Sequence, residues 1–154
     1  MGSDLHEALR ALYEGLLRGW NARDAGAFAS GFADDGVIIG FDGSENTGRA
    51  QIVEQIGLIF ADHPTGAYVG KVRDVRAIGD DAAILRAVAG IVPAGQSELN
   101  PQLNSVQSMT VERRDGQWRI VHYQNTPAAY HGRPELVEAL TDELREAQGD
   151  RAGG

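Results

Sequence analysis

The sequence predicts one α+β domain in which a curled antiparallel sheet covers three N-terminal helices and a further helix follows as a C-terminal extension. Three observations carry this prediction. Apolar residues recur at steps of three and four in the first third of the chain, the period changes to two between residues 68 and 125, and helical spacing returns after Pro127. Helices followed by a run of strands is the α+β order. Because such strands bury one face by curling over the helices, we expect a cavity at the open end of the sheet.

The predicted helices begin at recognisable caps. Asp4 and Glu7 have capping-box spacing at the start of the first helix, which is expected to end at Asn21. Asp24 is expected to cap a short second helix, and Thr47 a third. Apolar residues one turn apart give the buried faces: Leu5, Leu9, Leu12, Leu16 and Trp20 in the first helix, Phe28 and Phe32 in the second, and Ile52, Ile56, Ile59 and Phe60 in the third.

Turn residues separate the predicted strands, which cover residues 37–41, 68–78, 82–92, 105–114 and 117–125. The run 33–36 is interpreted as a turn, and Asp42 as the turn former that ends the first strand. Asp115-Gly116 predicts a two-residue type I′ turn in the last hairpin. The polar stretch 93–103 is long for a hairpin loop and is a candidate lid. Pro134 is expected at the start of the last helix, with the stripe Leu136, Leu140 and Leu144.

Residues 1–154 show no repeat and no linker, which predicts a single domain with residues 127–148 as an extension and 149–154 frayed. The formal net charge of −8 argues against nucleic-acid and membrane-surface partners. The absence of cysteine and of an N-terminal signal pattern favours a cytoplasmic location. The four histidines, His6, His63, His122 and His131, lack metal-ligand spacing, so no metal site is expected. With no phosphate-binding glycine loop and no nucleophile elbow, we expect a protein without a cofactor.

The last hairpin predicts the candidate site, because its turn sets the register. If Arg114 pairs with Gln117, then Met109 faces His122 and Gln107 faces Gln124 on the more apolar face. Polar groups in an apolar cavity cost free energy unless they are paired or meet a ligand. His122, Gln107 and Gln124 therefore predict either a ligand site or a self-satisfied structural network.

Other residues complete this hypothesis. Trp20, Phe41, Tyr68 and Met109 are expected to form apolar walls, although Trp20 also fits a purely core role. Arg86 fits either a buried anion anchor or a dimer contact. The opposite face of the hairpin, with Val121, Tyr123, Ser108 and Thr110, is too apolar for a solvated sheet and predicts a homodimer.

Several runs resemble the nuclear transport factor 2-like superfamily in its SnoaL-like group: Trp20-Asn21-Ala22-Arg23-Asp24, Phe32-Ala33-Asp34-Asp35-Gly36 and Gly116-Gln117-Trp118-Arg119-Ile120-Val121. The closing run 124–135, QNTPAAYHGRPE, is similar to the SgcJ/EcaC branch known from natural-product gene clusters. The resemblance implies a cone-shaped sheet on three helices, a deep pocket and a homodimer. When the chain is compared with ketosteroid isomerase, Gly40 occupies the position of that enzyme's catalytic base. Leu16 occupies the position of its oxyanion-hole tyrosine.

The resemblance and the residues together suggest a cofactor-independent pocket protein of polyketide or enediyne biosynthesis. It would bind an apolar intermediate and assist cyclisation or proton transfer, with His122 as acid or base and Gln107 and Gln124 orienting a carbonyl. The rival hypothesis is a non-catalytic binding or chaperone-like accessory protein of a synthase. A third reading is an interaction-only dimer with a filled pocket.

Overall fold

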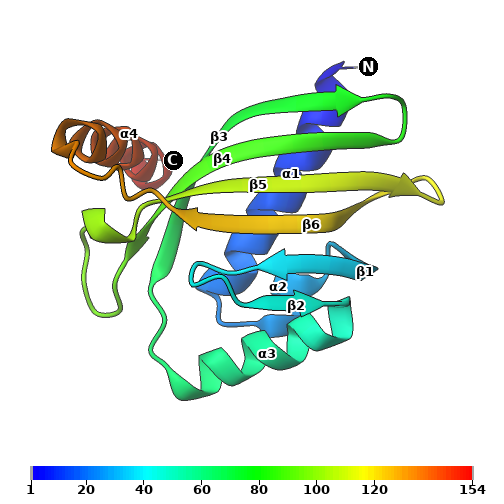
Figure 1. The fold of residues 1–154 in the computed structure, drawn as a ribbon, viewed down its shortest axis with the longest axis horizontal. Helices are drawn as coiled ribbons and strands as arrows, with labels where there is room; N and C mark the ends of the chain where they lie inside the picture. The colour runs from blue at the N-terminus through cyan, green and yellow to red at the C-terminus, as the bar shows by residue number, and fades with distance from the viewer. Residues whose placement is uncertain (1, 154) are drawn as a thin grey trace.

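A computed structural model describes residues 2–153, with side chains described for residues 4–149. The α+β class is confirmed, and Figure 1 shows the sheet bending in front of the long first helix. The helices are α1 (Gly2–Asn21), α2 (Ala25–Ala29), α3 (Arg49–Asp62) and α4 (Pro134–Gly153), with a single 3-10 turn η1 (Pro101–Leu103). The strands are β1 (Phe32–Ile39), β2 (Glu45–Thr47), β3 (Ala67–Ile78), β4 (Ala82–Val92), β5 (Ser105–Arg114) and β6 (Gln117–Pro127).

The strands of this described part form one sheet in the order β2-β1-β6-β5-β4-β3. Neighbours pair antiparallel except β1 and β6, which run parallel. The first and last strands of the sequence therefore lie side by side, with only β2 between β1 and the edge of the sheet. This pairing brings residues near 40 next to residues near 124, and it forms one wall of the site described below.

The inner face of the sheet packs on α1. Leu9, Tyr13, Leu16 and Leu17 of the helix are at most 2% exposed and belong to the same apolar cluster as the inward side chains of β4 and β5. The close approach of α1 to β3 requires a glycine at position 70. A Cβ on Gly70 would lie 2.5 Å from both the Tyr13 hydroxyl and a Leu17 methyl group. The missing side chain of Gly70 thus leaves room for the Tyr13 hydroxyl and the Leu17 methyl group.

The last hairpin has the predicted turn but a different register. Asp115 (φ 52°) and Gly116 (φ 77°) both have the positive φ that a type I′ turn requires, and Val111 pairs with Ile120 as expected. A register shift follows, so that Thr110 pairs with His122 and Met109 with Tyr123. Val121 is the extra residue of a β-bulge, which places two residues opposite one and reverses the facing of everything beyond it.

The expectation that Met109 faces His122 and Gln107 faces Gln124 is therefore wrong. Gln107 pairs with Asn125, and Gln124 pairs with Ser108. The geometry of a two-residue turn determines the register only up to the first irregularity, and the bulge follows after four residue pairs.

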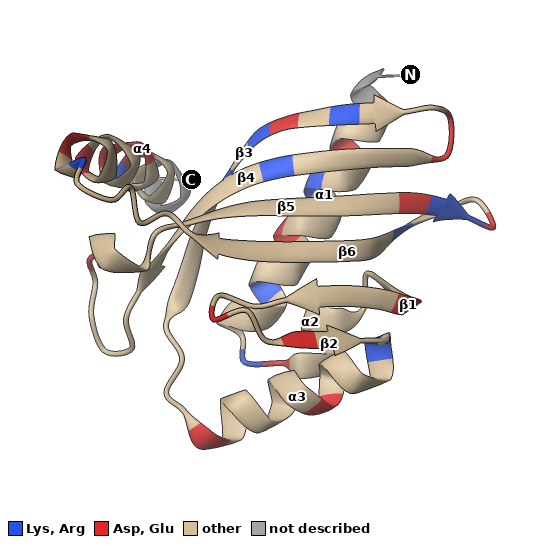
Figure 2. Cartoon of the chain, in the orientation of Figure 1, with Lys and Arg blue, Asp and Glu red and all other residues tan. Residues whose placement is uncertain are grey.

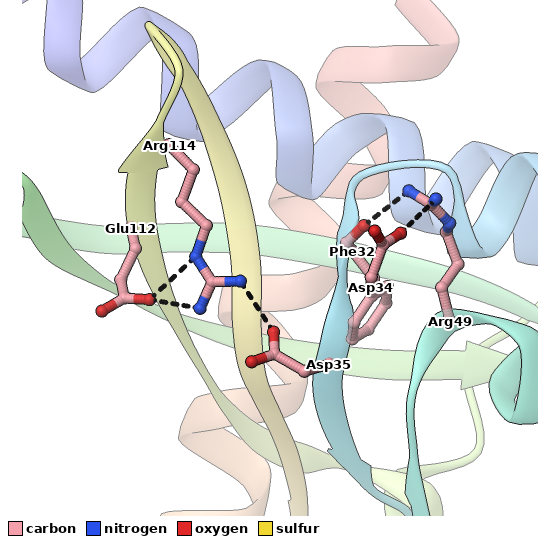
Figure 3. Close-up of polar contacts among 6 residues, drawn as sticks. All are labelled: Phe32, Asp34, Asp35, Arg49, Glu112 and Arg114. Carbon is pink, nitrogen blue, oxygen red and sulfur yellow. Dashed lines mark hydrogen bonds and ion pairs between the residues drawn. The ribbon is translucent and has the colours of Figure 1, made fainter.

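The run 33–36 is strand rather than the turn that its sequence favours. It lies in β1 at a register irregularity, and its two carboxylates make ion pairs (Figure 3). Asp34 pairs with Arg49 of α3 at 2.5 Å, and Asp35 pairs with Arg114 at 2.8 Å. Arg114 also pairs with Glu112 at 2.6 Å, so this charged group joins β1 to the end of the last hairpin. The pairs are exposed, and such pairs add little stability.

The caps of the short helices are partly as predicted. The Asp24 carboxylate accepts a hydrogen bond from Ala27 N at 3.0 Å and caps α2. Thr47 does not cap α3, because the cap position is Gly48 with φ 92°. The backbone N–H of Thr47 donates instead to the Gln51 side chain at 2.7 Å.

Helix α4 covers one end of the outer face, the face of the sheet opposite α1. Leu140 and Leu144 are buried there against Val69, Val88 and Leu99, as the predicted stripe requires, while Leu136 remains 36% exposed. Leu99 belongs to the stretch 93–103. This leucine packs against α4, residues 94–98 are exposed, and the pocket lining holds no residue of the stretch, so the stretch does not form the lid expected from its length. The helix continues to Gly153, past the expected boundary at residue 149; the fraying predicted for 149–154 falls partly outside the described residues.

Arg86 also lies on the outer face. It pairs with Asp74 of the neighbouring strand, with Nε donating to the carboxylate at 3.0 Å. This exposed ion pair excludes the reading of Arg86 as a buried anion anchor.

Candidate functional site

A pocket of about 360 Å³ opens between the helices and the β1–β2 side of the sheet. This volume lies within the range of small-molecule sites. Its apolar lining comes from α1, α2, α3, β1 and the turn after β1: Trp20, Phe28, Ile38, Phe41, Ile56 and Ile59. Its polar lining has Gly40, Asp42, Ser44, Asn46, Gln55, Tyr68, Tyr123 and Asn125. Figure 1 shows α3 lying alongside β2 at this side of the molecule.

Trp20 is both a core residue and a pocket wall. Its ring packs within 5.8 Å of Phe28, 5.1 Å of Phe60 and 5.5 Å of Tyr68, measured between ring centroids. Its indole N–H donates to the carbonyl of Gly66 at 3.0 Å. The two readings of Trp20 are therefore compatible, because one face of a large aromatic ring can pack in a core while the other remains accessible.

A chain of buried hydrogen bonds runs from α1 to the pocket. The Tyr13 hydroxyl donates to Gln107 Oε1 at 2.5 Å, and Gln107 Nε2 donates to Asn125 Oδ1 at 3.2 Å. Asn125 Nδ2 then donates to the Tyr68 hydroxyl at 3.0 Å. Since Asn125 and Tyr68 line the pocket, the chain fixes the orientation of the polar groups that a ligand meets.

Asn21, the last residue of α1, holds Tyr68 in place from the backbone side. Its amide donates to the Tyr68 carbonyl at 3.1 Å, and its carbonyl oxygen accepts from Tyr68 N–H at 2.8 Å. These two hydrogen bonds join the start of β3 to the end of α1. They hold the Tyr68 backbone in place while its side chain lines the pocket.

Two tyrosine hydroxyls in the pocket can donate hydrogen bonds to a ligand. Burial raises the pKa of Tyr68, and the hydrogen bond from Asn125 offsets part of this rise. Burial also raises the pKa of Tyr123 well above 10.0, and the nearby Tyr13 and Tyr68 add to the shift. Both hydroxyls therefore keep their protons at neutral pH and can donate hydrogen bonds.

Asp42 lies at the exposed mouth of the pocket. Its carboxylate accepts a hydrogen bond from Ser44 N at 2.9 Å, which forms the turn that the sequence predicts. This hydrogen bond lowers the pKa of Asp42 below 3.8, so the group is charged at neutral pH. It is the single acidic side chain of the described lining, which holds no Lys, Arg or His.

The structure brings some of the predicted site residues together and separates others. Trp20, Phe41 and Tyr68 line the pocket as expected. Met109 and Gln107 are inward but at most 1% exposed, so they lie behind the lining. His122 and Gln124 lie on the outer face, because beyond the bulge at Val121 they alternate with the buried Tyr123 and Asn125. The geometric basis for His122 as a pocket acid or base is therefore wrong.

Tyr123 and Asn125 are two pocket residues that the sequence argument missed, because it placed both on the opposite face of the sheet. The predicted register exposed an aromatic ring, Tyr123, while it buried His122 and Gln124. A tyrosine is buried more often than a glutamine. That imbalance was the available signal for a one-residue shift in the strand.

The fold is shared with several solved structures. A protein of Nostoc punctiforme described as a domain of unknown function with a cystatin-like fold has TM-score 0.81 at 22% identity, covering 99% of this chain and 98% of that one. An NTF2-like protein of Novosphingobium aromaticivorans has TM-score 0.68 at 21% identity, covering 87% and 88%. A ketosteroid isomerase-like protein of Erwinia carotovora atroseptica has TM-score 0.66 at 16% identity, covering 83% and 98%. None of the curated proteins matches this sequence.

The protein thus has the cystatin-like, or NTF2-like, fold, with a curved sheet, helices on its inner face and a pocket between them. The SnoaL-like domain family matches residues 9–130, and the chain belongs to this family. Helix α4 lies beyond the matched region. No described helix is long and apolar enough to cross a bilayer.

Proposed function

We propose that this protein is a cofactor-independent pocket protein that binds an apolar intermediate of polyketide-type natural-product biosynthesis. The apolar pocket with its hydrogen-bonding end carries the proposal, since small-molecule sites combine an apolar lining with a few placed polar groups. The polyketide or enediyne context is supported by the similarity of residues 124–135 to the SgcJ/EcaC branch. A cytoplasmic location agrees with this role and stays a prediction.

The geometry favours binding over acid–base catalysis. The tyrosine hydroxyls hold their protons at neutral pH, and the hydrogen bond from Ser44 makes the Asp42 carboxylate a weak base. The accessory-protein hypothesis is therefore the leading form of the proposal. Cyclisation or proton transfer is the second candidate, because Asp42 places one carboxylate at the pocket. In that case Asp42 would take a proton from a carbon next to a carbonyl and later return it to the product.

Blocking the pocket tests the binding function. Ile59 lines the pocket, whereas its neighbour Leu58 is 53% exposed on the same helix. We expect Ile59→Trp to abolish binding of acetylnaphthalene in isothermal titration calorimetry and Leu58→Trp to leave it unchanged. Native mass spectrometry of the freshly purified protein would show any retained ligand. Binding that survives Ile59→Trp unchanged would contradict the pocket as the site.

Proton exchange separates binding from catalysis. Acetylnaphthalene has exchangeable methyl protons next to its carbonyl, and NMR in deuterated buffer measures their loss. A binding protein should give the buffer rate, and Asp42→Asn should change nothing. A rate above buffer that falls with Asp42→Asn would establish the catalytic alternative.

We also propose that a second copy of the chain covers the free part of the outer face. Figure 2 shows the middle of β5, β6 and β1 without charged residues, next to the end that α4 covers. Since the bulge buries Tyr123, the residues on this face differ from the predicted set. They are the exposed Val106 and the half-buried Ser108, Thr110, His122 and Gln124. Val106 is 43% exposed, and Val106→Arg should convert a dimer to a monomer in sedimentation velocity. A wild-type monomer at micromolar concentration would contradict the proposal.

A further inference from the structure

The charge of the pocket lining restricts which ligands can enter. Asp42 at the mouth is negative, and no described lining residue is a Lys, Arg or His. A carboxylate or phosphate would lose its hydration without gaining a cationic partner, which is unfavourable. The net charge of −8 adds long-range repulsion of anions. The pocket therefore disfavours anionic ligands.

Tyr123 supplies a hydrogen-bond donor that the protein itself does not use. Its side chain is 4% exposed and lines the pocket, and its hydroxyl makes no hydrogen bond with the side chains and backbone described here. The hydroxyl oxygen is not one of the buried unsatisfied atoms of the described residues, so it is open to the pocket, where an oxygen atom of a ligand can accept its hydrogen bond.

Tyr68 supplies a second donor close by. Its hydroxyl accepts from Asn125 Nδ2 at 3.0 Å and donates to no acceptor among the described residues. Asn125 and Tyr123 are two residues apart on β6 and share the inner face, so the Tyr68 hydroxyl reaches the strand that carries Tyr123. Accepting one hydrogen bond strengthens a hydroxyl as a donor.

We infer that the pocket selects uncharged aromatic or polyene ketones, whose carbonyl oxygen accepts hydrogen bonds from Tyr68 and Tyr123 while the apolar body lies against Trp20, Phe28 and Ile59. A carbonyl oxygen has two lone pairs and can accept from both hydroxyls. This inference rests on the proposed binding function and names its ligand class. Tyr68 and Tyr123 are then the specificity-determining residues.

Three ligands of the same shape test the inference by calorimetry at neutral pH. Acetylnaphthalene presents a carbonyl, isopropylnaphthalene replaces the carbonyl with a carbon branch, and naphthoate carries a negative charge. We expect acetylnaphthalene to bind and naphthoate to show no measurable binding. In Tyr68→Phe and Tyr123→Phe, affinity for the ketone should fall about two- to tenfold each, the loss expected for one hydrogen bond. Affinity for isopropylnaphthalene should not fall.

Tyr130→Phe is the matched control, because Tyr130 is half-buried beside α4 and outside the pocket. It should leave all affinities unchanged. Equal losses for ketone and hydrocarbon in the pocket variants would overturn the inference, and so would naphthoate binding as tightly as the ketone. If neither uncharged compound binds the wild-type protein, the proposed function fails and this inference fails with it.

Discussion

Asn125 and Gln124 are neighbours on β6 with opposite surroundings, and replacing each by leucine tests the bulge that builds the pocket. Asn125 is 6% exposed and bridges Gln107 and Tyr68 by hydrogen bonds. In Asn125→Leu, whose side chain has nearly the same shape, Gln107 Nε2 loses its partner at a site that is 1% exposed. An orphaned buried donor costs about 1–3 kcal/mol of unfolding free energy. For a domain of this size that corresponds to a fall in Tm of about 2 to 12 °C.

Gln124→Leu is the control, since its side chain lies on the outer face and makes no hydrogen bond within the described residues. It should change the unfolding free energy of the monomer by no more than about 0.5 kcal/mol. Urea unfolding followed by circular dichroism and by tryptophan fluorescence measures both variants. If Gln124→Leu proves the more destabilising change, β6 has the unbulged register, and Tyr123 and Asn125 do not belong to the pocket.

Three further predictions concern the histidine, the extension and the tyrosines. His122→Ala should retain full affinity for acetylnaphthalene, because His122 pairs with Thr110 on the outer face, and a loss of affinity in calorimetry would contradict its placement. Leu144→Ala should lower the unfolding free energy by about 2–5 kcal/mol, the cost of a buried cavity, because Leu144 is 0% exposed; an unchanged urea midpoint would mean that α4 does not pack as described. The pKa values of Tyr68 and Tyr123 lie above 10.0, so the unfolded chain releases protons that the folded chain retains, and stability should fall as pH rises past 10. Ultraviolet titration of the wild type against Tyr68→Phe and Tyr123→Phe should show that both hydroxyls ionise only above that pH, and ionisation of either near pH 10 in the folded protein would contradict its burial.

The sequence by itself determined the elements that depend on neighbouring residues. The carboxylate of Asp24 caps α2, and Asp115-Gly116 forms the type I′ turn, because caps and two-residue turns depend on the local backbone alone. The apolar periods located the long strands and the helices, and the stripe Leu140–Leu144 predicted which face of α4 is buried. Trp20 and Tyr68 could be assigned to the pocket wall because large aromatic rings flank the helix–sheet boundary.

Only the tertiary structure decided which residues face the pocket. The bulge at Val121 arises where β6 pairs with β5 on one side and with β1 on the other, and no local pattern encodes a pairing between segments some eighty residues apart. Successive side chains of a strand point to opposite faces of the sheet. One extra residue therefore places Tyr123 and Asn125, instead of His122 and Gln124, on the inner face. The hairpin turn predicted a site with an imidazole and two amides. For this physical reason β6 instead presents Tyr123 and Asn125 to a pocket that has no cationic side chain in its described lining.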